Sequence, residues 1–420
     1  MSTSDLLSVD EALQRVLDGV STLSPEIVPL QDALGRILVK PAIANDDLPP
    51  FANSAMDGYA VKAEDISRAS ELEPISLDVI GDIPAGVVGD FSLISGTSAR
   101  IMTGAPLPSG ADAIVPVEFT NEPWRERERP LQKKIEINKP VKVGDYVRWP
   151  GEDVQAGSEV MPSGHRLRPQ EIGVLASLGL TEISVVREPR IAILATGDEL
   201  ISVDEPLVPG KIRNSNSYTL VAQVGSMGAE AIDLGVAKDT YLDVESKLAE
   251  DIDQRADLFI STAGVSVGAF DVVKDVLVMG GEVGFWRVNM RPGKPLAFGA
   301  YGGVPYLGLP GNPVSAMVSF ERFARPAILK LGGHSRLKRP RVQAVIQEEI
   351  FSDGRESYLR AIVRLEEGEY LVDLSGRQDS HVMTSLVNAN GLLIVPAGVR
   401  HLLAGRKAEV MMLDWPEEVF

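Results

Sequence analysis

Three short loops in the middle of the chain contain residue types that could bind an anionic, phosphate-bearing ligand. Residues 263–268 combine glycine and serine after an apolar run, and Asp271 lies just beyond them. Residues 196–199 place two carboxylates after a second apolar run, and residues 308–313 place two glycines and an asparagine after a third. A strand, a glycine-containing loop and a helix in succession aim backbone N–H groups and a positive helix end at an anion.

Charged residues near these loops indicate what else the ligand would need. Arg291 and Lys294 add two cations, and the carboxylates would suit a hard cation such as Mg²⁺ held among phosphate oxygens. Each loop taken singly is explained at least as well by ordinary turn chemistry, because glycine and proline are turn residues and loop carboxylates are mostly solvated. The coincidence of three such loops favours a site. The residues alone therefore predict a phosphate-anchored ligand with Mg²⁺ and leave the reaction open.

A parallel sheet would bring these loops together. From residue 191 onward, apolar strand-like runs alternate with segments of helical spacing, which is the pattern of a parallel sheet covered by helices on both faces. The carboxyl ends of such strands share one edge, and ligands bind there. The predicted strands are 191–195, 230–236, 258–261, 283–288, 295–298 and 304–307, and the predicted helices are 217–227, 241–256, one beginning at Phe270, and 313–331.

The remaining segments predict smaller modules. Helices are expected at 8–20, where Ser8 can cap the first turn, and at 30–38 and 169–178. Short strands separated by Gly/Pro-rich turns predict one β module before residue 143 and another after the basic segment 334–340. Two interpretations of residues 53–58 remain open from the sequence. The segment is either an Asx-type turn stabilised by its own side chains or a functional segment.

Composition excludes several classes of protein. The formal charge of −18 over 420 residues, without a compensating basic block, argues against a nucleic-acid surface. The absence of cysteine excludes disulfides, thiolate zinc sites and cysteine nucleophiles, and the four scattered histidines show no metal-binding spacing. Neither a signal peptide nor an apolar run of membrane-spanning length is recognisable, so we expect a soluble cytoplasmic protein.

Seven segments along the chain resemble the MoeA family of molybdopterin molybdenumtransferases, which is similar to the E domain of gephyrin. In chain order they are N-S-A-M-D-G-Y-A-V (53–61), R-I-M-T-G-A-P-L-P-S-G-A-D (100–112), G-E-D (151–153), T-G-D-E-L (196–200), G-V-S-V-G (264–268), R-P-G-K-P (291–295) and G-L-P-G-N-P-V-S (308–315).

The resemblance implies an α/β multidomain fold, in which a central three-layer α/β parallel-sheet domain of the molybdopterin-binding type is flanked by two small β modules and a helical and strand linking domain. The implied domains are 1–48 plus 144–180 for linking and dimerisation, 49–143 as a small β domain, 181–335 as the α/β domain and 336–420 as a C-terminal β-barrel-like domain. It also implies a homodimer that acts on adenylylated molybdopterin and molybdate with Mg²⁺ as cofactor, releases AMP, and makes transient contact with the molybdopterin adenylyltransferase.

The resemblance also assigns residues to roles by position. The catalytic residues would be Asp57, Thr103, Asp153, Glu199 and Lys294, and the metal ligands would be Glu199, Asp239 and Asp271. The substrate-binding residues would be Arg148, Asp239, Gly264, Ser266, Gly268, Asp271, Arg291, Pro310, Gly311, Asn312, Pro313, Arg355 and Ser380.

The chain departs from the family pattern at a few positions. Ala263 stands where glycine is usual, so it would be strained if the position needs a positive φ. Ala269 and Phe270 stand where a polar residue often follows the loop, and Arg291 stands where lysine is common. These departures concern substrate affinity more than the type of reaction.

Two other functions are compatible with the resemblance. A non-catalytic scaffold would have no reason to keep the carboxylates, and a molybdopterin adenylyltransferase would lack the two β modules and the segment 53–61. Preference for molybdate over tungstate, and the molybdoenzyme that receives the cofactor, are not readable from the sequence.

Overall fold

The computed structural model describes residues 6–122, 130–252, 256–263, 276 and 283–416. The chain divides into two units, one formed by Met1–Val39, Gly164–Arg168 and Ile183–Phe420, and the other by Lys40–Ser163 and Pro169–Glu182. Among the described helices, none combines the length and the apolar character that crossing a membrane requires.

The first unit is built on a six-stranded sheet with strand order β15-β12-β16-β20-β19-β17. The first four strands are mutually parallel, whereas β20, β19 and β17 pair antiparallel. Because β19 runs antiparallel to both of its neighbours, β17 points in the same direction as the first four strands. The sheet is therefore mixed, and the predicted parallel direction holds for five of its six strands, with β19 reversed. Their bounds are β12 (Arg190–Thr196), β15 (Glu230–Ala237), β16 (Leu258–Thr262), β17 (Val283–Arg287), β19 (Pro295–Tyr301) and β20 (Val304–Leu309).

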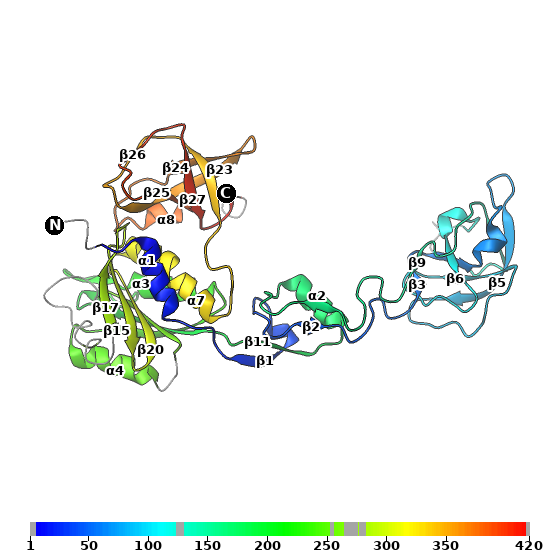
Figure 1. Ribbon diagram of the computed structural model, residues 1–420, viewed down its shortest axis with the longest axis horizontal. Helices are drawn as coiled ribbons and strands as arrows, with labels where there is room; N and C mark the ends of the chain where they lie inside the picture. Colours follow the sequence, from blue (N-terminus) through cyan, green and yellow to red (C-terminus); the bar gives the residue numbers. More distant parts are fainter. Residues whose placement is uncertain (1–5, 123–129, 253–255, 264–275, 277–282, 417–420) are drawn as a thin grey trace. The chain divides into compact units, whose positions relative to one another are not determined.

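Helices cover both faces of this sheet, as the alternating pattern predicts (Figure 1). Because side chains alternate along a strand, Ile191 and Ile193 join one core and Ala192 and Leu194 join the other. The first core is shared with α1 (Val9–Asp18), α3 (Ser215–Gly225), α6 (Pro313–Ser319), the π-helical η5 (Phe320–Ala324) and α7 (Arg325–Leu331). The second is shared with α4 (Tyr241–Ile252).

Several predicted elements agree with the structure in detail. Ser8 caps α1 by accepting a hydrogen bond from the Glu11 N–H at 3.2 Å. The predicted helix 313–331 is continuous but contains the π segment η5. The helix predicted to begin at Phe270 lies outside the described residues.

The helix predicted at 30–38 is wrong. Only a single 3₁₀ turn, η2 (Leu30–Asp32), forms there. Gly35 adopts φ +81°, and Ile37 and Leu38 form β-bridges with Arg166 and Val185. Long-range strand pairing therefore overrides the local helical spacing. Two further ribbons complete this region, β1 (Pro25–Pro29) with β11 (Glu182–Val186) and β13 (Leu200–Ile201) with β14 (Ile212–Arg213).

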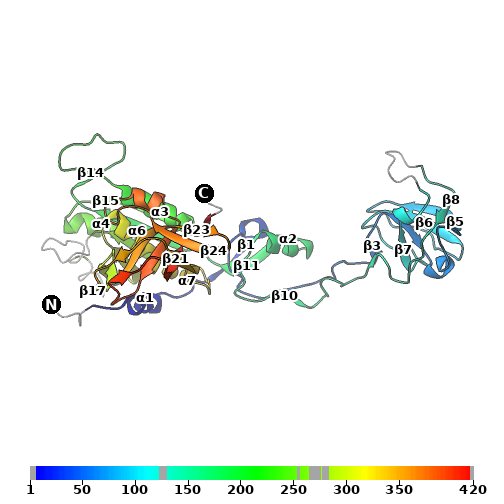
Figure 2. The same ribbon diagram turned by 90° about the horizontal axis from the view of Figure 1, so that it is seen from above.

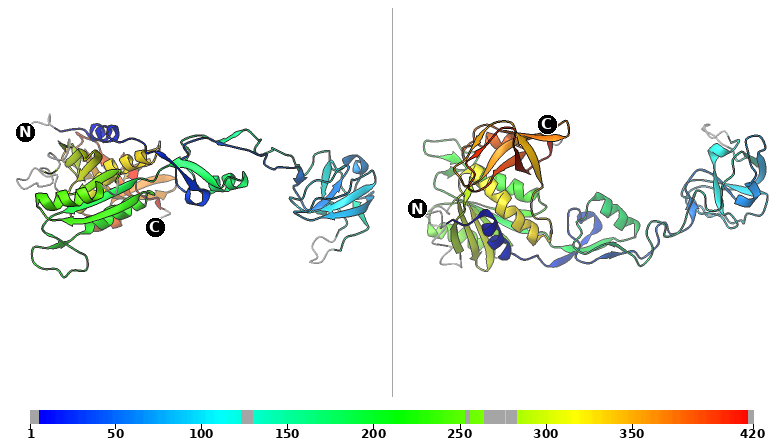
Figure 3. Two further views of the ribbon diagram at one scale, coloured as in Figure 1. Left: turned by 90° about the horizontal axis from the view of Figure 1, so that it is seen from below. Right: turned by 45° about the horizontal axis from the view of Figure 1, so that its top comes forward.

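The C-terminal part of the first unit is a closed barrel. Strands run in the order β18-β23-β24-β21-β27-β25, and β23 also pairs with β25, which closes the ring. Figures 1 and 3 show the barrel, coloured orange to red, next to the sheet face that α3 and α7 cover. The bounds are β18 (Met290–Arg291), β21 (Arg341–Ile346), β23 (Glu356–Glu366), β24 (Glu369–Leu374), β25 (Gly391–Val395), β27 (Lys407–Met412), the ribbon of β22 (Ile350–Phe351) and β26 (His401–Leu402), and α8 (Thr384–Val387).

The second unit contains a five-stranded sheet with strand order β7-β4-β6-β5-β8. Two apolar clusters pack on its two faces, as expected for a small β module. Its bounds are β2 (Ala42–Ile43), β3 (Asn53–Ser54), β4 (Gly58–Val61), η3 (Ala63–Ile66), β5 (Ile75–Ile83), β6 (Thr97–Ile101), β7 (Ala113–Pro116), η4 (Val117–Phe119), β8 (Lys134–Ile137), β9 (Val147–Arg148), β10 (Glu159–Met161) and α2 (Pro169–Ser177).

Candidate active site

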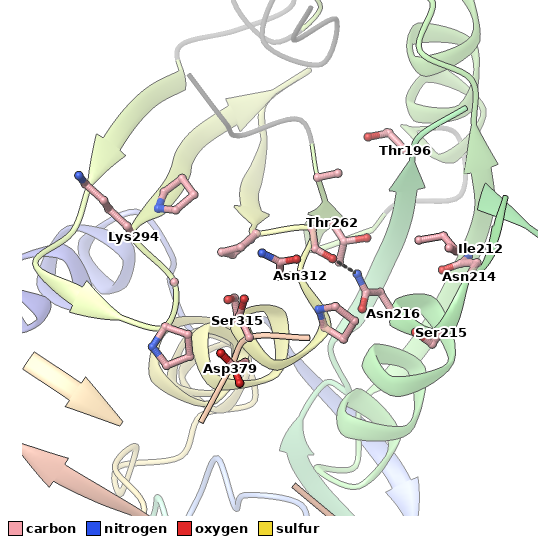
Figure 4. A pocket seen from close by; sticks show the side chains of 18 of the residues that line it. Thr196, Ile212, Asn214, Ser215, Asn216, Thr262, Lys294, Asn312, Ser315 and Asp379 are labelled. Atoms are coloured by element: carbon pink, nitrogen blue, oxygen red, sulfur yellow. Dashed lines mark hydrogen bonds between the residues drawn. The ribbon is translucent and has the colours of Figure 1, made fainter. Parts of the chain in front are cut away.

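A cavity of about 730 Å³ lies at the carboxyl edge of the parallel strands, between the sheet and the barrel. Thr196 ends β12, Thr262 ends β16, and residues 310–313 follow β20, and all of them line it (Figure 4). The loops predicted to meet at one sheet edge do so wherever the structure describes them. Within the cavity lining are the predicted site residues Glu199, Arg291, Lys294, Pro310, Gly311, Asn312, Pro313, Arg355 and Ser380.

The loop after β20 is held by contacts from two other segments. Asn312 occupies the N-cap position of α6 and Pro313 the first turn, yet the Asn312 side chain makes no capping hydrogen bond. The N–H of Val314 instead donates to the Ser380 carbonyl at 3.2 Å. A residue of the barrel therefore accepts a hydrogen bond from one of the first N–H groups of the helix, which have no partner within the helix itself. Asn216 Nδ2 donates to the Gly311 carbonyl at 2.8 Å (Figure 4).

Sequence reasoning missed the residues 214–216, which also line this cavity. Asn214 caps α3 by accepting from the Ser217 N–H at 3.2 Å, which places Ser215 and Asn216 at the start of the helix. The run Asn-Ser-Asn-Ser before an apolar periodic segment is an N-cap signature and could have indicated them. Figure 2 shows the connection between β13 and β14 extending away from the sheet before the chain enters α3.

Ala263 has a left-handed backbone, with φ +71°. The position therefore does need a positive φ, and alanine is strained there in a way that glycine is not. A Cβ placed on Gly311 would lie 3.3 Å from the Ala263 Cβ, so these two lining residues pack tightly against each other. The predicted ligands Gly264, Ser266, Gly268 and Asp271 lie outside the described residues.

Three cations enter the cavity from the segment 291–294 and from the barrel. Arg355 donates from Nη2 to Asp353 Oδ2 at 2.6 Å and from Nη1 to the Met290 carbonyl at 3.2 Å. Arg291 Nη1 lies 3.8 Å from the same Asp353 oxygen. Although burial opposes ionisation, hydrogen bonds from Arg355 and the charges of Arg355 and Arg291 lower the pKa of Asp353. Lys294 makes no ion pair with any residue that the structure describes. Together with Arg213, the described lining holds four cations against the carboxylates Glu199 and Asp379, so it keeps a surplus of positive charge.

Close packing fixes the turn between these cations. Gly293 has φ +100°, and a Cβ there would lie 2.5 Å from Ser319 Oγ and 2.7 Å from Met290 Cε. Only glycine fits, so the backbone between Arg291 and Lys294 can lie directly against the helix α6.

Arg360 is fully buried and organises the loop that carries Ser380. Its Nη2 donates to the carbonyls of Arg377 and Asp379, both at 3.1 Å, and its Nε donates to Ser385 Oγ at 3.0 Å. Burial lowers the pKa of Arg360 to about 10, so the guanidinium stays charged at neutral pH. Residues 378–380 of this loop line the cavity, and Arg360 positions them without lining it.

An acidic group lies at the end of β12. The Asp198 N–H donates to Asp239 Oδ2 at 3.4 Å, and the Asp239 N–H donates to Asp198 Oδ1 at 3.3 Å. Burial, together with repulsion from Asp198 and Glu199, raises the pKa of Asp239. Glu199 lines the cavity and Asp239 does not. Over the described part of the chain, no three carboxylate or histidine side chains converge closely enough to enclose a metal ion.

The other predicted site residues belong to the second unit. Asp57 Oδ1 accepts from both the N–H and the Oγ1 of Thr103, each at 2.8 Å, and both side chains are exposed. The preceding turn is stabilised by its own residues, because Ser54 Oγ donates to the Met56 carbonyl at 2.5 Å. Residues 53–56 are therefore explained as a self-stabilised turn, and Asp57 lies exposed after it. Arg148 pairs with Asn53 between β9 and β3.

Asp153 lines a cavity of about 460 Å³ within this unit, formed by residues between 151 and 160. Its N–H donates to the Leu48 carbonyl at 2.9 Å, which fixes the backbone and leaves the carboxylate exposed.

Comparison with known proteins matches three family models to consecutive parts of the chain. The MoeA N-terminal region (domain I and II) matches residues 7–179, a probable molybdopterin binding domain matches 192–330, and the MoeA C-terminal region (domain IV) matches 343–413. The first match contains three of the seven motifs and the second contains the other four, whereas the third covers a region in which no motif was identified.

Relatives match over nearly the whole length. The molybdopterin molybdenumtransferase of Nostoc sp. is 39% identical over 397 residues, 92% of this chain and 88% of the relative. Molybdopterin molybdenumtransferase 2 of Mycobacterium tuberculosis is 40% identical over 413 residues, 96% of this chain and 98% of the relative. The crystal structure of the molybdopterin biosynthesis moeA protein from Pyrococcus horikoshii OT3 has a TM-score of 0.79 at 30% identity, over 97% of this chain and 100% of that chain.

The motifs, the multidomain α/β architecture with its C-terminal barrel, and these full-length matches agree. The resemblance inferred from the sequence is confirmed, and the chain belongs to the MoeA family.

Proposed function

We propose that this chain is a molybdopterin molybdenumtransferase that inserts molybdate into adenylylated molybdopterin, cleaves the bond between the pterin phosphate and AMP, and releases AMP. Water supplies the oxygen that replaces the bridging oxygen in one of the two phosphates. Molybdate binds the two dithiolene sulfurs and loses one oxo ligand, which leaves as water with the two thiol protons, to give the molybdenum cofactor. The observation that carries the proposal is the cation-rich cavity at the sheet edge, in a chain whose relatives are molybdenumtransferases.

The charges in this cavity suit two anionic substrates. Arg213, Arg291, Lys294 and Arg355 present four positive charges, whereas Glu199 and Asp379 of the lining and Asp353 beside it balance three of them. Cleavage of a phosphoanhydride builds negative charge on the phosphate oxygens, and preorganised cations stabilise that charge without a protein nucleophile. A chain without cysteine and without a histidine cluster fits such a reaction.

The acidic group fits Mg²⁺ by its chemistry. Glu199 and Asp239 supply oxygen donors, and Mg²⁺ takes one or two carboxylates together with substrate phosphates rather than a closed protein cage. The raised pKa of Asp239 reflects carboxylate repulsion that a bound cation would relieve. These two residues, with Asp271 as the third predicted ligand, would hold the ion, which would neutralise phosphate charge.

Residues of the second unit enter the proposal through assembly. We propose a homodimer of four-domain chains, in the cytoplasm, in which Asp57, Thr103, Arg148 and Asp153 of one copy act on substrate bound to the partner copy. A transient contact with the molybdopterin adenylyltransferase would deliver the adenylylated substrate. Mixing two inactive variants, Asp57→Ala and Lys294→Gln, should then restore part of the activity, whereas failure to complement would favour a site within one copy.

The reaction is tested by supplying adenylylated molybdopterin, molybdate and Mg²⁺ and measuring AMP. We expect molybdate-dependent AMP release that falls about 100-fold in Lys294→Gln, the size seen when one charge-stabilising donor is lost. Lys407→Gln, on the exposed side of β27, is the matched control and should retain activity. AMP release no higher than in a protein-free blank would refute the function.

A further inference from the structure

A second large cavity, of about 780 Å³, lies in the first unit and shares no lining residue with the first. Its described lining contains five arginines and a single carboxylate, Asp414, although the chain as a whole carries a formal charge of −18. A local charge opposite to that of the protein, in a concave surface, requires an explanation. The arginines are Arg166, Arg168, Arg325, Arg336 and Arg339.

Strand periodicity places the first two arginines on the cavity side. Residues 164–168 pair with residues 35–38, with the Leu38 N–H donating to the His165 carbonyl and the Leu167 N–H donating to the Arg36 carbonyl, both at 2.9 Å. Leu167 is fully buried at 0% exposure, so Arg166 and Arg168 on either side of it point the other way.

A helix end supplies the opposite wall. After α7 the chain turns back, with Gly333 at φ +80° and with the Gly332 and His334 N–H groups donating to the carbonyls of Ile328 and Leu329 at 3.0 and 2.9 Å. This C-terminal turn sends residues 334–339 back along the helix, where Arg325 Nη1 donates to the Leu337 carbonyl at 3.0 Å. Arg336 and Arg339 are thereby carried to the same cavity as Arg325.

Only part of this charge is balanced. Glu321 binds Arg339 through two hydrogen bonds, of 2.9 and 3.2 Å, and lies 3.8 Å from Arg325 Nε. Arg166 and Arg336 pair with no carboxylate in the described part of the chain. Burial and the charges of Arg166 and Arg325 lower the pKa of His334 to about 4, so this lining histidine is neutral at pH 7 and adds no charge of its own.

We propose that this cavity is a second anion site, which binds a small phosphorylated molecule through Arg166, Arg325 and Arg336. Planar guanidinium groups bind phosphate oxygens in pairs, and arginines on three different segments would surround a ligand with more than one phosphate group. The volume is that of an ordinary small-molecule site, and Ile37, Met227 and Leu329 give it an apolar side on which an organic group would rest. The proposal is independent of the reaction proposed above.

Calorimetric titration with inorganic pyrophosphate at low salt tests the site, using the whole chain. We expect two binding events in the unaltered protein. Arg166→Gln/Arg336→Gln should weaken one at least 10-fold, and Arg291→Gln/Lys294→Gln should weaken the other. The control Arg364→Gln/Lys407→Gln removes two exposed charges of the barrel and should leave both unchanged. Repeating the titration with ADP asks whether an organic group adds affinity at the second site.

Labelling of the unaltered protein gives a check that does not depend on a variant folding. Phenylglyoxal should modify Arg166 and Arg336 at least fivefold more slowly in the presence of pyrophosphate, with Arg364 modified at an unchanged rate, as read by peptide mass spectrometry. A single binding event that Arg166→Gln/Arg336→Gln leaves intact, or labelling that pyrophosphate does not slow, would overturn the second site. Neither outcome bears on AMP release, which would fail only if the proposed function were wrong.

Discussion

Replacement of Ala263 by glycine should relieve strain in the wall of the candidate active-site cavity. A left-handed backbone costs an L-residue with a Cβ roughly 1–2 kcal/mol, and Ala263 has φ +71°. Glycine loses about 0.4–1 kcal/mol through the greater freedom of the unfolded chain. Loss of a half-buried methyl group takes away a few tenths of a kcal/mol more, about half the value for a fully buried one. The variant should therefore be about 0.5 kcal/mol more stable than the parent.

A matched control isolates the strain. Ala404 lies in an exposed turn and is absent from the described non-glycine residues with positive φ. Ala404→Gly therefore gains the same freedom in the unfolded chain but relieves no backbone strain, and it should be destabilised by about 0.4–1 kcal/mol. The difference between the two variants measures the backbone strain at residue 263 and should be about 1 kcal/mol or more.

Scanning calorimetry of the three proteins at one pH is the assay. For a folding unit of this size a difference of 1 kcal/mol corresponds to about 2 °C, so Ala263→Gly should melt at or above the parent and Ala404→Gly below it. If Ala263→Gly loses as much stability as Ala404→Gly, the position carries no strain and the reasoning is refuted.

Three further predictions concern single side chains. Asp57→Asn should lower molybdate-dependent AMP release about 100-fold with an unchanged melting temperature, because the residue is exposed; undiminished turnover would exclude a catalytic role. Arg360→Met should cost roughly 3 kcal/mol, because it leaves buried carbonyls of the Ser380 loop without donors, and should weaken AMP binding; an intact affinity in a calorimetric titration would contradict this positioning role. Asp239→Asn should raise stability slightly at pH 7, since the raised pKa means that this carboxyl favours the folded state when protonated and loses that contribution as pH rises through its folded pKa. The gain should vanish below the ordinary pKa of aspartate and shrink when Mg²⁺ is added, and urea titrations showing a less stable variant at pH 7 would reverse the sign of the argument.

The sequence by itself determined the α/β region and the place of its site. Apolar runs and helical spacing are local signals, and strand-to-helix loops of parallel strands must share one edge. Residues 196–199 and 308–313 could therefore be assigned to one cavity without coordinates. The glycines and prolines in these loops indicated where the backbone turns. The sequence also predicted that Ala263 would be strained if its position requires a positive φ.

Tertiary structure decided what depends on partners far away in the chain. Residues 30–38 have helical spacing, but their second half pairs with residues near 166 and 185, and no local pattern contains that information. The reversed direction of β19 likewise depends on which strands meet.

Buried charge shows the same limit most clearly. Arg360 looks like any strand arginine until the loop 377–380 folds over it. The five arginines of the second cavity come from segments more than 150 residues apart, and only the pairing of residues 164–168 with 35–38 and the turn after α7 bring them together. A sequence gives the number and order of charged residues, but it does not give the distances between them. Those distances are set only when distant segments pack together.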